Sequence, residues 1–191
     1  QIGSAIASLV LLSIGLAVIF GMMRVINLAH GEFLMLGGYA AITAHNLGVN
    51  LWLAMLLVAP VTVGLFGALV ERLVIRHLYG RLIDTMLATW GLSLAMIGFV
   101  TVVFGNTVSG ISAPLGSLSI GSYRTGRYEI FLIGVAALLL IGGAAVLRYT
   151  RLGLYTYAIG GNEQATRFSG VNINRYKLAV YTLMGLASGI A

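Results

Sequence analysis

Three side chains that can exchange a proton or hydrogen-bond a polar solute stand close together near the start of the chain. They are Asn27, His30 and Glu32, within the segment Val-Ile-Asn-Leu-Ala-His-Gly-Glu-Phe at 25–33. Ionisable groups at membrane depth are costly, and they usually face a protein interior or a water-filled path. Irregular backbone is tolerated in a membrane only where protein or a cavity shields it. The segment therefore predicts a pathway or hinge element.

The same three residues also allow a structural interpretation. Asn27 would cap a helix, while His30 and Glu32 would hold neighbouring helix ends at the membrane interface by hydrogen bonds. A metal site is not predicted, because His30 and Glu32 are two positions apart and point to different faces of a helix. Neither His45 nor His77 supplies a convincing third ligand.

A second group of polar side chains has a helical spacing. Thr85, Thr89 and Ser93 are four residues apart, so one face of a helix carries all three hydroxyls. Such a stripe could line a polar path, and it could equally serve helix packing, since Ser and Thr bond to the preceding turn. A hydrolase with Ser93 as nucleophile needs a base in reach. The spacing brings no such pair together, so we assign no catalytic residue.

The third candidate is the basic connection at 148–177. It contains Gly-Gly-Asn-Glu-Gln-Ala-Thr-Arg-Phe-Ser-Gly at 160–170, in which Asn162 can cap a short helix and Gly170 can end it in a left-handed turn. A short helix between two membrane spans suits docking to a partner. The alternative is an interfacial helix resting on anionic lipid.

The composition indicates the kind of protein that positions these groups. Of the 191 residues 59% are hydrophobic and 8% are charged, against about 25% charged in a typical soluble domain. Cysteine is absent, which excludes disulfides and cysteine ligands. The net charge of +6 does not indicate nucleic acid, because the basic residues are few and lie between apolar runs. The one lysine, Lys177, stands outside any phosphate-binding G-x-x-x-x-G-K-[ST] motif, so a nucleotide would have to bind to another subunit.

Four apolar runs are long enough to cross a bilayer as helices, which takes about 20 residues. They are 2–23, 51–70, 85–104 and 130–147, and shorter apolar pieces stand at 33–47 and 178–191. Small residues at helical spacing, such as Pro60, Gly64 and Ala68 or Gly91, Ala95 and Gly98, predict closely packed helices. We therefore expect an all-α polytopic transmembrane bundle. Because the chain begins at Gln1 and ends inside an apolar run, we expect a fragment of a longer protein, truncated at both ends.

Orientation follows from the basic connections, since Lys and Arg are retained on the cytoplasmic side. Arg72, Arg76 and Arg81 lie in one connection, and five basic residues lie between 148 and 177. The connection at 105–127 is rich in Gly, Ser and Thr, and we expect it outside. The run at 2–23 then crosses inward, 33–47 and 85–104 run outward, and 51–70 and 130–147 run inward.

Three motifs in this order resemble one family. They are Ile-Asn-Leu-Ala-His-Gly-Glu-Phe-Leu-Met-Leu-Gly at 26–37, Leu-Ala-Thr-Trp-Gly-Leu-Ser-Leu at 87–94, and Arg-Leu-Gly at 151–153 followed by 158–191. The chain from Phe20 onwards is similar to the membrane permeases of bacterial ABC importers for branched-chain amino acids and to their urea- and sugar-importing relatives.

The resemblance implies a fold, a location and partners. It implies one partial permease domain over 1–191, in the bacterial inner membrane, with a cytoplasmic coupling loop at 149–177. The expected partners are two ABC ATPase subunits that bind the ATP, a second permease subunit, a periplasmic solute-binding protein and membrane lipid. By analogy the segment 162–170 looks like the coupling helix that sits in an ATPase groove, and the residues expected there are Gly161, Asn162, Glu163, Arg167, Phe168 and Gly170.

The solute is less strongly indicated than the class of transporter. The motif around Asn27–Glu32 favours branched-chain amino acids, and the stretch at 87–94 is also similar to urea permeases. The amino-acid sequence at 160–163 and at Ser169-Gly170 is closer to that of sugar permeases. A different class is an ion-coupled secondary carrier, in which Glu32 would titrate, although the sequence shows no persuasive internal repeat.

Overall fold

The computed structural model describes residues 25–105, 117–120 and 123–191, together with positions 6, 9–10, 13, 16–17 and 19–21. The positions described among the first 21 residues are helical. Most of the predicted span at 2–23 lies outside the described residues, as does Arg24.

Helices make up nearly all of the described chain. In order they are α2 His30–Asn46, α3 Leu51–Leu53, the π-helix η1 Ala54–Val58, α4 Ala59–Leu73, the 3₁₀ helix η2 Ile75–Leu78, α5 Leu82–Phe104, α6 Arg127–Tyr149, α7 Arg151–Gly161, α8 Glu163–Phe168 and α9 Ile173–Ile190. Between α5 and α6 stands a two-stranded antiparallel hairpin, β1 Ser117–Ile120 and β2 Tyr123–Gly126, in which Ser117 pairs with Gly126. The predicted all-α class is confirmed, with the hairpin confined to one connection.

Three described helical stretches are long and apolar enough to cross a membrane: Leu51–Leu73, Leu82–Phe104 and Ile130–Tyr149. They correspond to the predicted runs at 51–70, 85–104 and 130–147, each extended by two or three residues at one end. The first is one continuous rod in which α3, η1 and α4 follow without a break. Pro60 stands in the first turn of α4, directly after η1, so the residue without an N–H lies where the π-helical bonding pattern ends.

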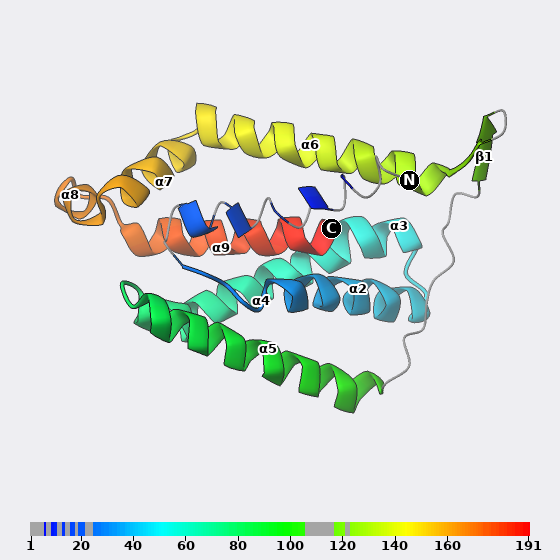
Figure 1. Ribbon diagram of the computed structural model, residues 1–191, viewed down its shortest axis with the longest axis horizontal. Coiled ribbons are helices and arrows are strands. Elements are labelled where there is room, and N and C mark those ends of the chain that lie inside the picture. The colour runs from blue at the N-terminus through cyan, green and yellow to red at the C-terminus, as the bar shows by residue number, and fades with distance from the viewer. Residues whose placement is uncertain are drawn as a thin grey trace.

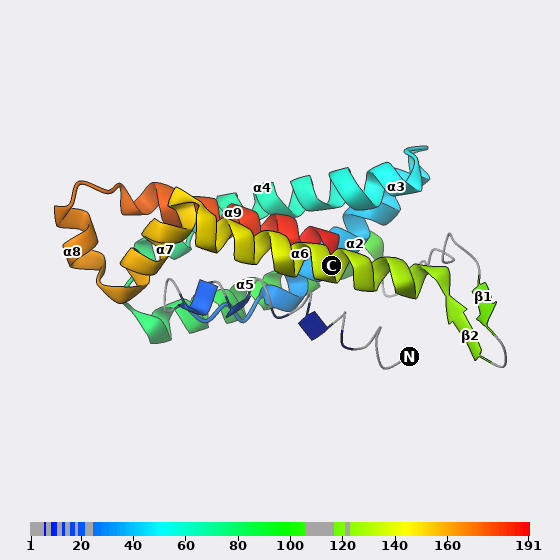
Figure 2. The same ribbon diagram turned by 90° about the horizontal axis from the view of Figure 1, so that it is seen from above.

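The long helices run along one common axis (Figures 1 and 2). The α4–α5 connection and α8 lie at one end of the molecule, and the hairpin lies at the other (Figure 1). The two basic connections thus share one end, as predicted from the positions of Lys and Arg. The positive-inside rule predicts that this end is cytoplasmic, and with that orientation α2, α5 and α9 would run outward and α4 and α6 inward.

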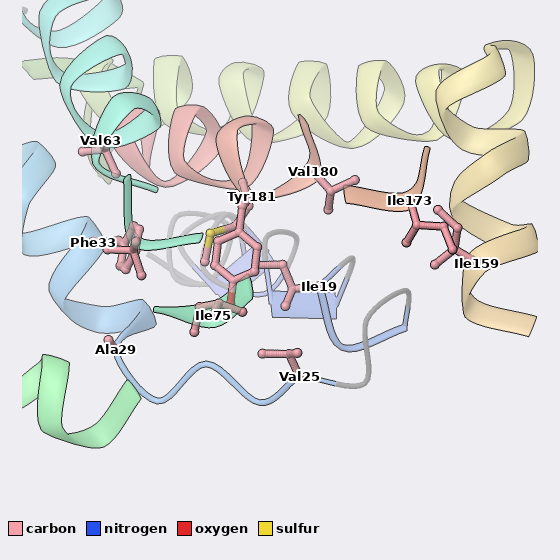
Figure 3. Packing of buried hydrophobic residues seen from close by; sticks show 12 residues of the cluster. Ile19, Val25, Ala29, Phe33, Val63, Ile75, Ile159, Ile173, Val180 and Tyr181 are labelled. Atoms are coloured by element: carbon pink, nitrogen blue, oxygen red, sulfur yellow. The ribbon is translucent and has the colours of Figure 1, made fainter. Parts of the chain in front are cut away.

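The tightest helix pair is α4 with α9. A Cβ added to Gly185 would lie 2.5 Å from the carbonyl oxygen of Val63, and one added to Gly64 would lie 2.9 Å from the side chain of Leu186. Small residues therefore let these backbones touch, which is how helices associate in lipid. Tyr181 points from α9 into the adjoining cluster of buried side chains, which also includes Phe33 of α2 (Figure 3). The packing predicted from Pro60 and Gly64 is present here.

The second small-residue stripe has no such partner in the described part of the chain. Gly91, Ala95 and Gly98 are exposed on α5, and an added Cβ at Gly91 or Gly98 would meet nothing within 4 Å. The buried face of α5 is instead the hydroxyl face, with Thr85, Thr89 and Ser93. α5 thus buries its hydroxyl face, together with Met96 and Val100, against the other described helices.

A sharp turn joins α6 to α7 and explains one of the recognised motifs. Thr150 caps α7, and its hydroxyl accepts a hydrogen bond from the N–H of Gly153 at 3.4 Å. A Cβ at Gly153 would overlap the carbonyl group of Leu147. The last position of the motif Arg-Leu-Gly at 151–153 therefore requires a residue without a side chain, which is glycine.

Candidate functional site

The segment before α2 is not helical, and Asn27 shapes it. The side-chain Oδ1 of Asn27 accepts a hydrogen bond from the N–H of Ala29 at 3.1 Å, while Ala29 itself is the N-cap residue of α2 and receives no side-chain cap. The expectation that Asn27 caps a helix is therefore corrected. The residue instead forms a turn two positions earlier, because Asn side chains readily bond to the backbone two residues on.

Thr89 of α5 holds this turn. Its Oγ1 accepts a hydrogen bond from the N–H of Leu28 at 3.1 Å and lies 3.3 Å from the carbonyl oxygen of Ile26. Thr89 is 1% exposed, and its hydroxyl is also 2.9 Å from the Thr85 carbonyl oxygen in its own helix. The non-helical segment is thereby shielded by a polar side chain of a neighbouring helix.

A second bond joins the same two elements one turn further along. Ser93 Oγ of α5 donates to Glu32 Oε1 of α2 at 2.6 Å. Two groups of polar residues that are far apart in the sequence, Asn27–Glu32 and the Thr85–Ser93 stripe, thus meet in one polar site. Of the expected residues, Thr85 alone faces away from α2, toward the α4–α5 connection, with its Oγ1 2.7 Å from the Arg81 carbonyl oxygen.

Two polar atoms of this site retain hydrogen-bonding capacity. Asn27 Nδ2, a donor, and Glu32 Oε2, an acceptor, are buried without a hydrogen-bond partner among the described residues. His30 is buried beside them in sequence, at the first turn of α2. No three metal-ligating side chains of the described residues lie together. Since buried polar groups are normally satisfied, the free donor and acceptor suit a molecule that both accepts and donates hydrogen bonds.

The predicted short helix after Gly161 is present as α8. Asn162 caps it, with its Oδ1 accepting from the N–H of Ala165 at 3.0 Å, and Gly170 follows it with φ +80°. Glu163 and Arg167 form an ion pair of 3.7 Å along the helix. Phe168 is 91% exposed at its end. The helix lies at the extreme end of the molecule, on the side of the two basic connections (Figure 1), and it presents an exposed aromatic ring.

A cluster of charged and aromatic side chains behind α8 was not identified from the sequence. Lys177 Nζ donates to Glu163 Oε2 at 2.9 Å and lies 3.7 Å from the centre of the Tyr79 ring. Tyr79 donates its hydroxyl to Glu71 Oε1 at 3.0 Å, and Arg76 pairs with Glu71 at 3.4 Å. Burial, reinforced by the Glu71 carboxylate, raises the pKa of the Tyr79 hydroxyl well above its usual range, so that it remains a donor.

The sequence held one signal for this cluster. Glu71 is an acidic residue at the end of an apolar run and is fully buried in the structure. Carboxylates are almost never fully buried unless they are paired, so an acid flanked by Arg72 and Arg76 predicts an inward-facing pair. Lys177 gave no such signal, because it stands in a basic stretch that also marks the cytoplasmic side.

Comparisons with known proteins give one family and a consistent set of relatives. Residues 1–191 match the family described as "Branched-chain amino acid transport system / permease component". The chain is 33% identical over 172 residues to the ribose import permease protein RbsC of Escherichia coli K12, which covers 87% of this chain and 51% of that protein. It is 29% identical over 141 residues to the galactose/methyl galactoside import permease protein MglC of Haemophilus influenzae, covering 69% and 40%.

A third relative covers a shorter stretch. The xylose transport system permease protein XylH of Escherichia coli K12 is 38% identical over 92 residues, which is 48% of this chain and 23% of that protein. The chain thus spans about half the length, or less, of these curated relatives. No solved structure gives a significant match.

Proposed function

Since the chain belongs to the family of branched-chain amino acid transport system permease components, we propose that it is part of the membrane-spanning subunit of an ATP-driven importer. The family and the three apolar helices confirm the predicted localisation, a multi-pass protein of the bacterial inner membrane. The observation that carries the proposal is the pairing of a polar intramembrane site, Glu32 with Ser93, with a capped and exposed helix α8 at the cytoplasmic end.

We assign ATPase docking to α8 and its flanks. Gly161 and Gly170 bound the helix, Asn162 caps it, and Phe168 presents its ring to the outside. An exposed aromatic ring is the type of group that anchors protein interfaces. ATP would be bound by the partner subunits, and this chain would act as a transport subunit rather than an enzyme. A second permease subunit and a periplasmic solute-binding protein complete the proposed complex.

The intramembrane site would act as a gate. Glu32 Oε2 and Asn27 Nδ2 are buried in this structure, so a solute reaches them only when α5 moves away from α2. That movement would break the bonds of Thr89 to the turn before α2 and of Ser93 to Glu32, and it would separate the ring of Tyr39 in α2 from that of Phe104 at the end of α5. Alternating access by movement of one group of helices against another is a general property of transporters.

We propose a hydroxylated solute, such as a pentose or hexose. The curated relatives are a ribose, a galactose/methyl galactoside and a xylose permease by name. Sugar hydroxyls donate and accept hydrogen bonds at once, which matches the free acceptor on Glu32 and the free donor on Asn27. The preference for branched-chain amino acids, and the urea alternative, receive no support from these relatives and stay as the competing predictions.

The test uses the full-length permease coexpressed with its ATPase and binding protein. Phe168→Ala is expected to reduce the amount of ATPase that copurifies at least fivefold, since the ring is exposed and its loss leaves the fold intact. Tyr157→Ala, which removes an exposed ring from neighbouring α7, is the matched control and should leave copurification within twofold. Equal ATPase recovery with both variants would overturn the docking assignment, and a secondary carrier, which needs no ATPase, would give that result.

A further inference from the structure

Lys177 joins elements that are far apart in the sequence. It stands in the second turn of α9, yet its ammonium group contacts Glu163 of α8 on one side and the Tyr79 ring, between η2 and α5, on the other. Its side chain is 2% exposed. A lysine ammonium is removed from water only where partners compensate for the lost hydration, and here a carboxylate and an aromatic face do so together.

The side of the cluster toward α4 is equally closed. Tyr79 offers its ring face to Lys177 and its hydroxyl to Glu71, which is fully buried in the last turns of α4. Arg76 neutralises the Glu71 carboxylate from η2. Positive and negative groups therefore alternate from α8 through α9 and the connection to α4, with Tyr79 at the centre.

By contrast, α8 has little apolar anchorage of its own. Thr166 is its one buried residue, and Phe168 points away from the protein. Among the described residues, one side-chain hydrogen bond joins α8 to α9, and it runs from Lys177 to Glu163. A displacement of α8 must either break this bond or move Lys177.

The cluster also reaches the helix that carries the polar site. Tyr79 directly follows Leu78, whose carbonyl oxygen lies 3.2 Å from the hydroxyl oxygen of Thr85 in the first turn of α5. From Thr85 the hydroxyl stripe continues to Thr89 and Ser93, which hold the start of α2. A movement of Tyr79 would thus reach the first turn of α5 through the adjacent Leu78.

We infer that Lys177 is a positioning residue that transmits the movement of α8 to the cytoplasmic ends of α4 and α5 through Tyr79. The inference rests on the proposed function, because it takes α8 as the ATPase-docking helix. It adds a role for Lys177, Tyr79 and Glu71, which lie behind the proposed docking surface.

The test measures ATP hydrolysis and solute uptake in the same proteoliposomes, with the full-length permease, its ATPase and its binding protein. Lys177→Gln should lower the uptake per ATP hydrolysed at least fivefold, with the amount of bound ATPase unchanged. Arg175→Gln removes the same charge from an exposed position of α9 that pairs with no described carboxylate, and should stay within twofold of the wild type. Lys177→Arg, which keeps the charge, should restore at least half of the ratio.

A second variant keeps the test informative if Lys177→Gln does not assemble. Glu163→Gln breaks the same ion pair from its partly exposed end and should give the same fall. In the double variant the two losses should be less than additive, because both variants remove the Lys177–Glu163 bond, while Glu163→Gln also removes the exposed pair with Arg167. This inference alone would be overturned if the wild type couples ATP hydrolysis to uptake and the uptake per ATP of Lys177→Gln or Glu163→Gln equals that of Arg175→Gln. Absence of ATP-driven uptake in the wild type would overturn the proposed function, and the inference with it.

Discussion

Ser93 of α5 donates a hydrogen bond to Glu32 of α2 at 2.6 Å, across 61 residues of sequence. The bond holds a carboxylate inside the apolar part of the protein and joins two helices that also meet through the rings of Tyr39 and Phe104. Glu32 keeps a second, unpartnered oxygen. The same pair can therefore close a path when it is intact and offer both groups to a solute when it opens.

Loss of the Ser93 hydroxyl should impair transport. Ser93→Ala leaves a buried carboxylate without its donor, and an unsatisfied buried partner costs about 1–3 kcal/mol. We expect solute uptake by the reconstituted complex to fall about tenfold with ATPase copurification unchanged. Thr101→Val on the same helix removes an exposed hydroxyl that bonds only to its own helix at Ile97, and should have no effect. Equal uptake by the two variants would show that the bond is dispensable.

Close packing of α4 on α9 predicts a sharp difference between two glycines. Gly185→Ala places a methyl group against the Val63 carbonyl oxygen, and overpacking of this kind costs about 1–3 kcal/mol. The Tm of the protein in detergent should fall by several degrees. Gly91→Ala, where an added Cβ meets nothing within 4 Å, should leave the Tm unchanged or raise it. A lower Tm for Gly91→Ala would instead indicate a neighbour on that face.

The cap of α8 should matter for docking. Asn162→Ala removes the bond to the Ala165 N–H, and loss of such a cap costs about 1 kcal/mol. Because α8 is one short helix with a single buried residue, it should fray and bind the ATPase two- to fivefold more weakly. Asn174→Ala, an exposed asparagine near the start of α9, is the control. Titration of ATPase subunits onto both variants in detergent gives the comparison.

The spans and the short helix α8 could be predicted from local sequence. Apolar length sets the spans, and Asn162 and Gly170 mark the two ends of α8 by capping and left-handed backbone, both of which act over a few residues. Span length and loop charge do not depend on the order or the angle of helix packing. The structure accordingly extends the predicted spans by only two or three residues and places the two basic connections at the same end, as predicted.

The composition of the site could not be predicted in the same way. Glu32 meets Ser93, and Thr89 holds the turn at Asn27, because one particular face of α5 packs toward α2. Apolar periodicity does not predict that face in a membrane, where both lipid and protein are apolar. Lys177 is the clearest case. As a charge in a basic connection it indicates the cytoplasmic side, yet its side chain turns inward to Glu163 and Tyr79.

The most direct test of the proposed function is ATP-dependent uptake by the full-length complex in proteoliposomes, with labelled ribose, xylose, leucine and urea compared at equal concentration. We predict uptake of a sugar that requires ATP and that Ser93→Ala reduces about tenfold. Uptake of leucine or urea in preference to either sugar would contradict the proposed solute. Uptake that proceeds equally without ATP would contradict the proposed mechanism.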